Sequence, residues 1–203
     1  MSARFRIGID LGGTKIEGAA IDACGSVRFR HRVATPAQDY RETINAIIDL
    51  VSTIEQEIGA TPPVGIGIPG AVSPATGLIK NANSTWLIGR PLQRDLERAL
   101  GRPTRLANDA NCFALSEATD GAGAAAETVF GVILGTGVGG GIAIRRQILV
   151  GANAIAGEWG AQSVALANAG RGSRTTLLVR PIRLSRNLPF GPGAGCGSSP
   201  PLS

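Results

Sequence analysis

The chain contains few aromatic, histidine and cysteine residues. Of its 203 residues, 4% are aromatic, one is histidine and three are cysteine, and the cysteines show no spacing typical of a metal site. A long hydrophobic run is also missing, because the longest uncharged stretch, Thr128–Ile144, holds six glycines and predicts buried strands with a loop instead of a membrane span. The first residues lack the apolar region of a signal peptide. We therefore expect a cytoplasmic protein with no membrane partner.

Acidic residues are absent from the end of the chain. Residues 1–160 carry fifteen basic and fifteen acidic side chains, whereas residues 161–203 carry five arginines and no acid, so this tail holds the whole net charge of +5. A basic tail is typical of a disordered arm or of a nucleic-acid or membrane contact. We favour a third interpretation, a shifted reading frame, and expect no nucleic-acid partner.

Apolar residues make up 43% of the chain, which excludes disorder for most of it. The first 160 residues alternate between strand and helix patterns, and this alternation predicts an α/β fold. Strands are predicted where apolar residues alternate with polar ones or form short continuous runs. These strands lie at Phe5–Asp10, Ile16–Ile21, Val27–Val33, Val64–Ile68, Thr104–Leu106, Thr128–Leu134 and Ile142–Ile144. Helical spacing predicts helices at Asp39–Glu57, at Leu92–Leu100 and from residue 109 or 110 to Thr119.

The first glycine-rich segment joins two predicted strands and reads Asp-Leu-Gly-Gly-Thr-Lys over residues 10–15. Gly12 and Gly13 allow a tight turn whose N–H groups can bind phosphate oxygens. Thr14 and Lys15 add a hydroxyl and a positive charge, and Asp10 offers a hard oxygen ligand for Mg²⁺. An ordinary hairpin turn is an equally good interpretation of the two glycines. The spacing of a Walker A loop is absent.

The second glycine-rich segment covers Gly135–Gly141 and includes a formal G-x-G-x-x-G. A dinucleotide site would need a helix after the glycines, but the residues that follow predict a strand. We therefore predict a loop over Gly135–Gly141 and a second phosphate-contacting hairpin. Its candidate phosphate contacts are Gly135, Thr136, Gly137, Gly139 and Gly140.

Three polar positions are candidates for chemistry. Asp109 lies where a predicted strand gives way to a helix, and it could accept a proton from a substrate hydroxyl; alone, the position favours a helix N-cap instead. Asn83 lies in a polar stretch with one tryptophan, which suits a sugar site or a solvated loop. Glu158 is either a sugar-hydroxyl acceptor or a surface acid.

Six motifs, taken in order, resemble the ROK family of sugar kinases, within the actin-like ATPase superfamily. They lie at Ile7–Lys15, Gly65–Gly70, Lys80–Trp86, Ala107–Asn111, Gly135–Gly139 and Ala156–Gly160. The resemblance covers residues 4–160 and is greatest for bacterial fructokinases, also called mannofructokinases, with N-acetylglucosamine kinases close to them. It implies an actin-like (ribonuclease H-like) fold, with an N-terminal lobe over residues 1–120, the start of a truncated second lobe over 121–160, and a tail unlike the family over 161–203.

The resemblance also implies an activity, namely transfer of phosphate from ATP, with Mg²⁺, to the 6-hydroxyl of a hexose. Fructose is the expected sugar, with N-acetylglucosamine and glucose as alternatives. Asp109 would be the general base, and Gly70, Asn83, Asn108 and Glu158 would bind the sugar. The ATP phosphates and Mg²⁺ would be held by the glycine-rich segments, at Gly8, Asp10, Gly12, Gly13, Thr14, Lys15, Gly135, Thr136, Gly137, Gly139 and Gly140. Relatives are often homodimers, so a homodimer is expected for the intact family but not for this chain, which largely lacks the lobe that dimerises.

The tail departs from the family pattern directly after Gly160, where the acidic residues also stop. The tail can be written in its usual four-fold codons, and the bases can then be read in a frame shifted by one base. In that frame, Ala161–Leu166 permits His-Asn-Pro-Leu-Pro-Trp. Leu177–Leu184 permits Cys-Trp-Cys-Gly-Arg-Ser-Gly-Cys. Both blocks resemble the family, in the right order and in one frame. We therefore hypothesise one extra base near the Gly160 codon.

A shifted frame has chemical consequences. The zinc ligands of the family, a closed structural type of site, are missing, and so is most of the second lobe. We therefore expect this chain to be inactive or nearly so. A catalytically dead phosphate-binding fragment is the alternative to a kinase. A ROK transcriptional repressor is not expected, because the first strand pattern leaves no room for preceding DNA-binding helices.

Overall fold

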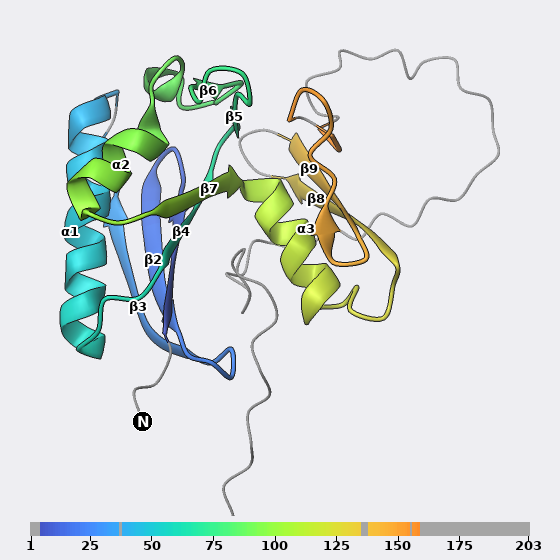
Figure 1. Ribbon diagram of the computed structural model, residues 1–203, viewed down its shortest axis with the longest axis horizontal. Coiled ribbons are helices and arrows are strands. Elements are labelled where there is room, and N and C mark those ends of the chain that lie inside the picture. The colour runs from blue at the N-terminus through green and yellow to red at the C-terminus, as the bar shows by residue number, and fades with distance from the viewer. Residues whose placement is uncertain (1–4, 37, 135–137, 155, 159–203) are drawn as a thin grey trace, which may run out of the picture.

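The computed structural model describes residues 5–36, 38–134, 138–154 and 156–158, and the described chain forms two units side by side (Figure 1). The first unit is a five-stranded sheet with the strand order β3-β2-β1-β4-β7. Strands β1 and β2 and strands β2 and β3 are antiparallel, whereas β4 is parallel to both β1 and β7. The strands span Arg6–Leu11 (β1), Lys15–Ile21 (β2), Val27–Ala34 (β3), Val64–Ile68 (β4) and Thr104–Asn108 (β7).

One face of this sheet is covered by α1 (Tyr40–Ile58) and α2 (Leu92–Leu100), which lie on the same side in Figure 1. Helix α1 begins after Asp39, whose side chain accepts a hydrogen bond from the Glu42 N–H, and it ends at Gly59 in the left-handed conformation. Its apolar stripe is buried against the strands. At Gly18 in β2, a methyl group would lie 2.6 Å from Ile54 Cδ1, so the glycine lets α1 pack directly on the sheet.

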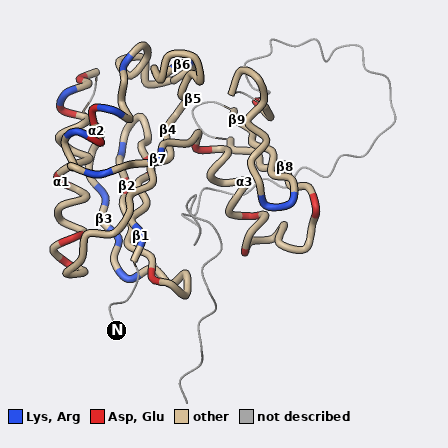
Figure 2. The backbone as a smooth tube through the Cα atoms, viewed as in Figure 1, with Lys and Arg blue, Asp and Glu red and all other residues tan. Residues whose placement is uncertain are grey.

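Strand β3 is an edge of this sheet and carries arginine at every second position. Arg28 donates to Asp22 Oδ2 at 2.6 Å, and Arg30 and Arg32 both pair with the buried Glu17 on β2. Figure 2 shows these basic residues along β3. Charged side chains on an edge strand oppose pairing with another chain, so this edge is protected.

Three short elements connect β4 to α2, namely β5 (Ala71–Val72), β6 (Ile79–Lys80) and the 3-10 turn η1 (Thr85–Leu87). Strands β5 and β6 pair with each other. The sequence patterns did not predict these elements, because two or three residues are too few to show a period.

The second unit is a three-stranded sheet with helix α3 (Asp109–Thr119) packed on one face. Its strand order is β10-β9-β8, with bounds Thr128–Leu134 (β8), Val138–Ile144 (β9) and Gln147–Ile148 (β10). A methyl group at Gly141 would lie 2.5 Å from Ala110 O, and one at Gly131 would lie 2.9 Å from the Phe113 ring. Glycine at these positions is therefore what allows α3 to approach the hairpin.

The structure confirms most of the predicted elements and corrects two of them. Val64–Ile68, Leu92–Leu100 and Thr128–Leu134 have their predicted bounds. The strand predicted at Thr104–Leu106 continues to Asn108, and the prediction of a loop over Gly135–Gly141 was wrong in its second half, since β9 begins at Val138. The glycines of β9 disfavour a strand by propensity, but pairing with β8 and contact with α3 override that preference.

Candidate active site

The candidate residues meet where three parallel strands end. Asp10 on β1 is opposite Gly67 on β4, and Gly67 is opposite Ala107 on β7. Asn108 and Asp109 follow directly. A methyl group built on Gly67 would lie 3.9 Å from Asp109 Cα, so β4 and the start of α3 are close at this edge. The carboxyl ends of parallel strands are the usual place for a ligand in α/β sheets.

Asn108 connects the end of β7 to the turn after β4. Its Oδ1 accepts from the Asn111 N–H at 3.1 Å, which makes Asn108 the N-cap of α3, and its Nδ2 donates to Gly70 O at 3.0 Å. Gly70 has a φ of 108°, and a methyl group there would lie 2.6 Å from Lys80 O. The interpretation of Asp109 as the cap was therefore wrong, because the residue before it caps the helix.

Asp109 is the first residue of α3 and is half-buried. Its Oδ1 accepts a hydrogen bond from the Ala110 N–H at 2.8 Å. Burial raises the pKa of Asp109 above its usual value, the Ala110 bond opposes this, and the negative charge of Glu158 raises the pKa further. Asp109 is thus not the N-cap of α3, and its carboxylate lies at the strand ends with Oδ1 held by the Ala110 N–H.

Asp10 is half-buried near the end of β1. Burial, followed by the negative charges of Asp109 and Glu17, raises the pKa of Asp10 to about 6, although Lys15 and Arg32 lower it in part. Asp10 and Asp109 are therefore close enough to repel each other. A cation between them and a phosphate group would relieve that repulsion.

Asp10 is the residue at this site that could hold a magnesium ion shared with a ligand. Among the described residues, no group of three or more His, Cys, Asp or Glu side chains is placed to hold a metal. Magnesium in phosphate-transfer sites is commonly bound by one or two carboxylates together with phosphate oxygens. Asp10 supplies such a carboxylate.

The turn between β1 and β2 exposes Gly13, Thr14 and Lys15 to solvent. The Gly12 N–H donates to Lys15 O at 3.0 Å and closes the hairpin. Thr35, directly after β3, holds the turn with two hydrogen bonds. Its hydroxyl donates to Gly12 O at 2.8 Å, and its N–H donates to Thr14 O at 3.1 Å. Sequence reasoning missed Thr35, which is distant along the chain.

Gly8 is buried inside β1 and belongs to the strand, not to the exposed turn.

The second glycine-rich segment reaches the site through β9. A methyl group at Gly139 would lie 3.7 Å from Ala110 Cβ and 3.8 Å from Glu158 Oε1, so Gly139 lies beside the acidic residues. Gly140 is buried in the same strand. The predicted contacts at Gly135, Thr136 and Gly137 lie outside the described residues.

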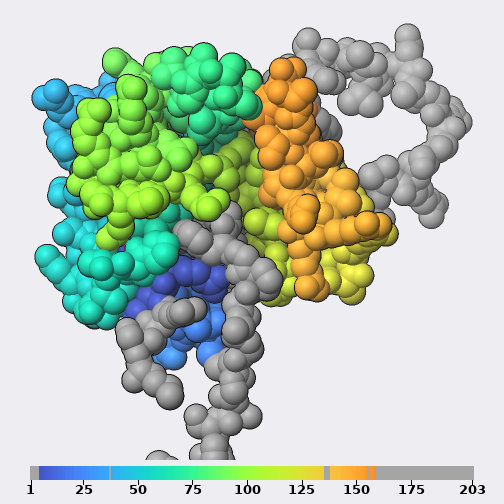
Figure 3. All heavy atoms as spheres, viewed as in Figure 1, coloured from blue at the N-terminus to red at the C-terminus, as the bar shows by residue number. Residues whose placement is uncertain are grey.

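The predicted sugar-binding residues come from both units. Asn83 is exposed between β6 and η1, and Glu158 is half-buried with its pKa raised by burial. Figure 3 shows the yellow and orange atoms of the second unit beside the green atoms of the first. Lys80 connects the two, since its Nζ donates to Asn153 O at 2.7 Å.

Asn111 is a further polar residue at this site that the sequence did not single out. It is buried, and its Oδ1 has no hydrogen-bond partner among the described residues. A buried, unpaired amide oxygen is costly, and such groups are found where a ligand or water completes the bond. In the sequence it was visible only as the last residue of the Ala107–Asn111 motif.

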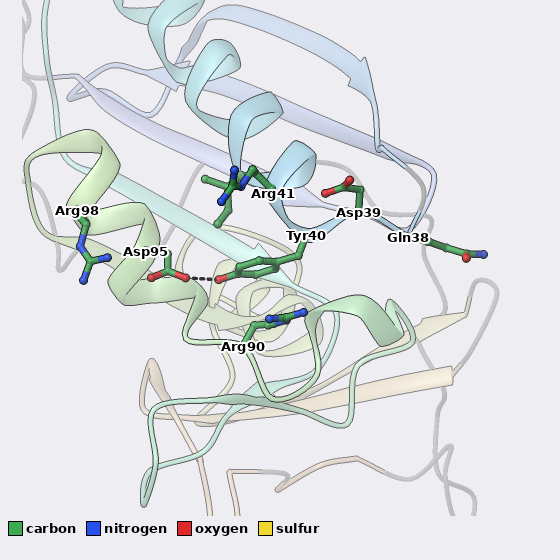
Figure 4. Close-up of a pocket in the computed structure, with 8 residues that line it drawn as sticks. Gln38, Asp39, Tyr40, Arg41, Arg90, Asp95 and Arg98 are labelled. Carbon is green, nitrogen blue, oxygen red and sulfur yellow. Dashed lines mark hydrogen bonds between the residues drawn. The ribbon is translucent and has the colours of Figure 1, made fainter.

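A separate hollow of about 690 Å³ lies between the first turn of α1 and helix α2, and no predicted site residue lines it. Figure 4 shows Tyr40 pointing across it to Asp95. The Tyr40 hydroxyl donates to Asp95 Oδ2 at 2.8 Å, and the Arg90 guanidinium lies 5.2 Å from the Tyr40 ring centre. These contacts join the two helices across the hollow.

Comparison with known proteins gives a consistent set of relatives. The family described as "ROK family" matches residues 6–199. The chain is 44% identical over 153 residues to an N-acetyl-D-glucosamine kinase of Haemophilus influenzae, covering 75% of this chain and 50% of that protein. It is 44% identical over 156 residues to the corresponding enzyme of Pasteurella multocida, covering 77% of this chain and 51% of that one.

Solved structures show the same likeness. A ROK family glucokinase from Streptomyces griseus, in complex with glucose and AMPPNP, is similar with a TM-score of 0.69 and 34% identity, over 76% of this chain and 49% of that one. The chain thus spans about half the length of the relatives it matches.

No helix among the described residues is long and apolar enough to cross a membrane.

Proposed function

Because this chain belongs to the ROK family, we propose that it is the half of a cytoplasmic hexose kinase that carries the general base and the phosphate-binding turn. The reaction is transfer of the γ-phosphoryl group of ATP to the 6-hydroxyl of a hexose. The observation that supports this best is the meeting of Asp10 and Asp109, which repel each other, at the ends of β1 and β7.

In this proposal, Asp109 accepts the proton of the sugar hydroxyl. The bond from sugar oxygen to γ-phosphorus forms while the bond from γ-phosphorus to the leaving ADP oxygen breaks. A raised pKa makes a carboxylate a better proton acceptor, and a positioned base of this kind contributes about 10²–10⁴-fold to the rate. Asn108 holds the carboxylate in place, because it fixes the start of α3 against the Gly70 turn.

ATP supplies the phosphoryl group, and Mg²⁺ neutralises charge on its phosphates. The exposed turn at Gly12–Lys15 would bind phosphate oxygens through its N–H groups and the Lys15 ammonium, with Thr35 keeping the turn rigid. Asp10 would hold Mg²⁺. Gly139 lies beside Glu158, since a methyl group there would be 3.8 Å from Glu158 Oε1.

N-Acetylglucosamine is the sugar that the relatives favour, because those at 44% identity are N-acetylglucosamine kinases. The fructose preference expected from the sequence has no support among them. Asn83, Asn108 and Glu158 would bind sugar hydroxyls, and the Gly70 turn would contact the ring. Glucose is the second choice, from the likeness to the Streptomyces griseus glucokinase.

A binding fragment without catalysis is the other candidate, and the half-length match favours it. One experiment separates the two. Coupled ADP release is measured with N-acetylglucosamine, glucose, mannose and fructose, using this chain alone and residues 1–160 fused to the remaining half of the Haemophilus influenzae enzyme. We expect no turnover by the chain alone and turnover by the fusion, fastest with N-acetylglucosamine. A fusion that folds and binds nucleotide but turns over none of the sugars would refute the kinase proposal.

A further inference from the structure

Ser84 is a buried serine whose hydroxyl the fold does not use. It is 3% exposed and precedes the 3-10 turn η1 as its N-cap, a position where a serine side chain ordinarily accepts a hydrogen bond from the turn. Here that bond is absent, and the hydroxyl makes no hydrogen bond to any residue that the structure describes. Buried hydroxyls are ordinarily paired, so the partner of this one is expected to be a water molecule or a ligand.

The segment that carries Ser84 is fixed to the first unit. The Leu87 N–H donates to Ser84 O at 3.0 Å, and Leu87 itself is fully buried. Trp86 Nε1 donates to Thr43 Oγ1 on α1 at 3.2 Å. The Ser84 hydroxyl therefore has a defined place before any ligand binds, as a binding group requires.

This hydroxyl lies beside the exposed turn between β1 and β2. A methyl group built on Gly13 would lie 3.7 Å from Ser84 Oγ and, apart from its chain neighbours, within 4 Å of no other described atom. The Gly13 and Thr14 N–H groups donate to no residue in the described part of the chain. Two unpaired N–H groups and a hydroxyl thus occur together around Gly13, and donors of these kinds bind phosphate oxygens.

We propose that the Ser84 hydroxyl donates a hydrogen bond to the γ-phosphate of ATP. Ser84 directly follows Asn83, a candidate sugar-binding residue, and it lies next to Gly13 in the phosphate-binding turn. The γ-phosphate is the part of ATP that meets the sugar hydroxyl, so a residue adjacent to both groups would contact this phosphate and not the α- or β-phosphate. The inference rests on the proposed function, because it takes the turn to bind ATP.

Nucleotide affinity tests this contact. AMPPNP, which has a γ-phosphate, and ADP, which has none, are each titrated with Mg²⁺ into the full chain by isothermal titration calorimetry. We expect Ser84→Ala to weaken AMPPNP binding about 10-fold to 100-fold, the usual effect of losing a hydrogen bond to a charged group, and to change ADP binding less than twofold. Unchanged AMPPNP binding, or equal weakening of both nucleotides, would overturn the inference.

Two further variants separate the hydroxyl from its surroundings. Ser84→Cys keeps a side chain of similar shape but offers only a weak donor, so it should weaken AMPPNP binding as Ser84→Ala does. Thr85→Ala removes the neighbouring exposed hydroxyl and should leave both affinities unchanged. Thermal unfolding verifies that each variant is folded, and Ser84→Cys decides if Ser84→Ala is not. Normal AMPPNP binding by Ser84→Cys would assign Ser84 to packing instead.

The result is distinguishable from that of the proposed function. Selective loss of AMPPNP affinity would support the inference even if the fusion of residues 1–160 turned over no sugar. Turnover by the fusion, together with unchanged AMPPNP binding by Ser84→Ala, would overturn the inference alone. A chain that binds neither nucleotide would overturn both the inference and the phosphate-binding turn on which it rests.

Discussion

At the scale of single residues, the site is defined by carboxylates whose ionised forms the fold disfavours. Asp10 and Asp109 are half-buried, and each has its pKa raised first by burial and then by a neighbouring negative charge. Neutral side chains at these two positions would make the folded protein more stable. Residues that destabilise the ligand-free protein are common where a cation or a substrate is bound.

A pH-dependent cost to stability follows from Asp10. Its pKa is about 6 in the folded protein and 3.8 in the unfolded chain. The folded state therefore binds the proton more tightly, and stability falls as the pH rises from about 4 to about 6, by at most about 3 kcal/mol. In buffer with EDTA, Asp10→Asn should be more stable than the unaltered chain at pH 7.5 and equal to it at pH 4.

Urea unfolding at the two pH values measures this effect. Added Mg²⁺ should raise the stability of the unaltered chain and leave that of Asp10→Asn unchanged, because only the carboxylate offers the ion a ligand. If Asp10→Asn were less stable at pH 7.5 than the unaltered chain, the Asp10 carboxylate would be stabilising and our electrostatic description would be wrong.

At the scale of elements, the contact between α3 and β9 determines where Asp109 lies. A methyl group at Gly141 would meet the Ala110 backbone at 2.5 Å, whereas one at Gly139 would have, among the described residues, no atom nearer than 3.7 Å. Gly141→Ala should therefore lower the free energy of unfolding by about 1–3 kcal/mol, the usual effect of overpacking. Thermal unfolding followed by circular dichroism measures it.

Gly139→Ala is the matched control, because it makes the same change in the same strand with room for the methyl group. Its effect on stability should be below about 0.5 kcal/mol. Equal destabilisation by the two substitutions would indicate that strand propensity, and not contact with α3, determines the need for glycine in β9.

Strand and helix periodicity predicted most elements, because each has a buried face that leaves a regular pattern. Leu92–Leu100 and Val64–Ile68 are examples. The pattern could not locate the start of β9, since glycine has no side chain to show which face is buried. It also could not separate Asn108 from Asp109 as the helix cap, because both residue types are good caps. Thr35 joins the site through a tertiary contact that no local pattern encodes, because its hydroxyl donates to Gly12 O.

At the scale of the whole molecule, the described residues form a five-stranded unit beside a three-stranded one. The first unit has its core filled from α1 and α2, and one of its edges is protected by arginines. Among the described residues, helix α3 covers one face of the second unit, and the other face combines the buried Val132 with the exposed Phe130 and Leu134. This asymmetry agrees with a match to half of each relative.

A shifted reading frame remains our hypothesis for residues 161–203. The match to the family extends to residue 199, whereas the matches to the curated relatives span 153 and 156 residues. Sequencing the coding DNA across the Gly160–Ala161 junction should find one extra base. The hypothesis would be contradicted if the coding sequence contained no extra base and no other reading frame encoded the family motifs.

The general base is the central claim, and one measurement tests it directly. In the fusion of residues 1–160 with the remaining half of the Haemophilus influenzae enzyme, ADP release with N-acetylglucosamine is compared before and after Asp109→Asn, and AMPPNP binding is measured for both. We predict that Asp109→Asn lowers kcat by about 10²–10⁴-fold while AMPPNP binding changes less than threefold. Turnover retained within tenfold by a folded, nucleotide-binding Asp109→Asn variant would contradict the assignment.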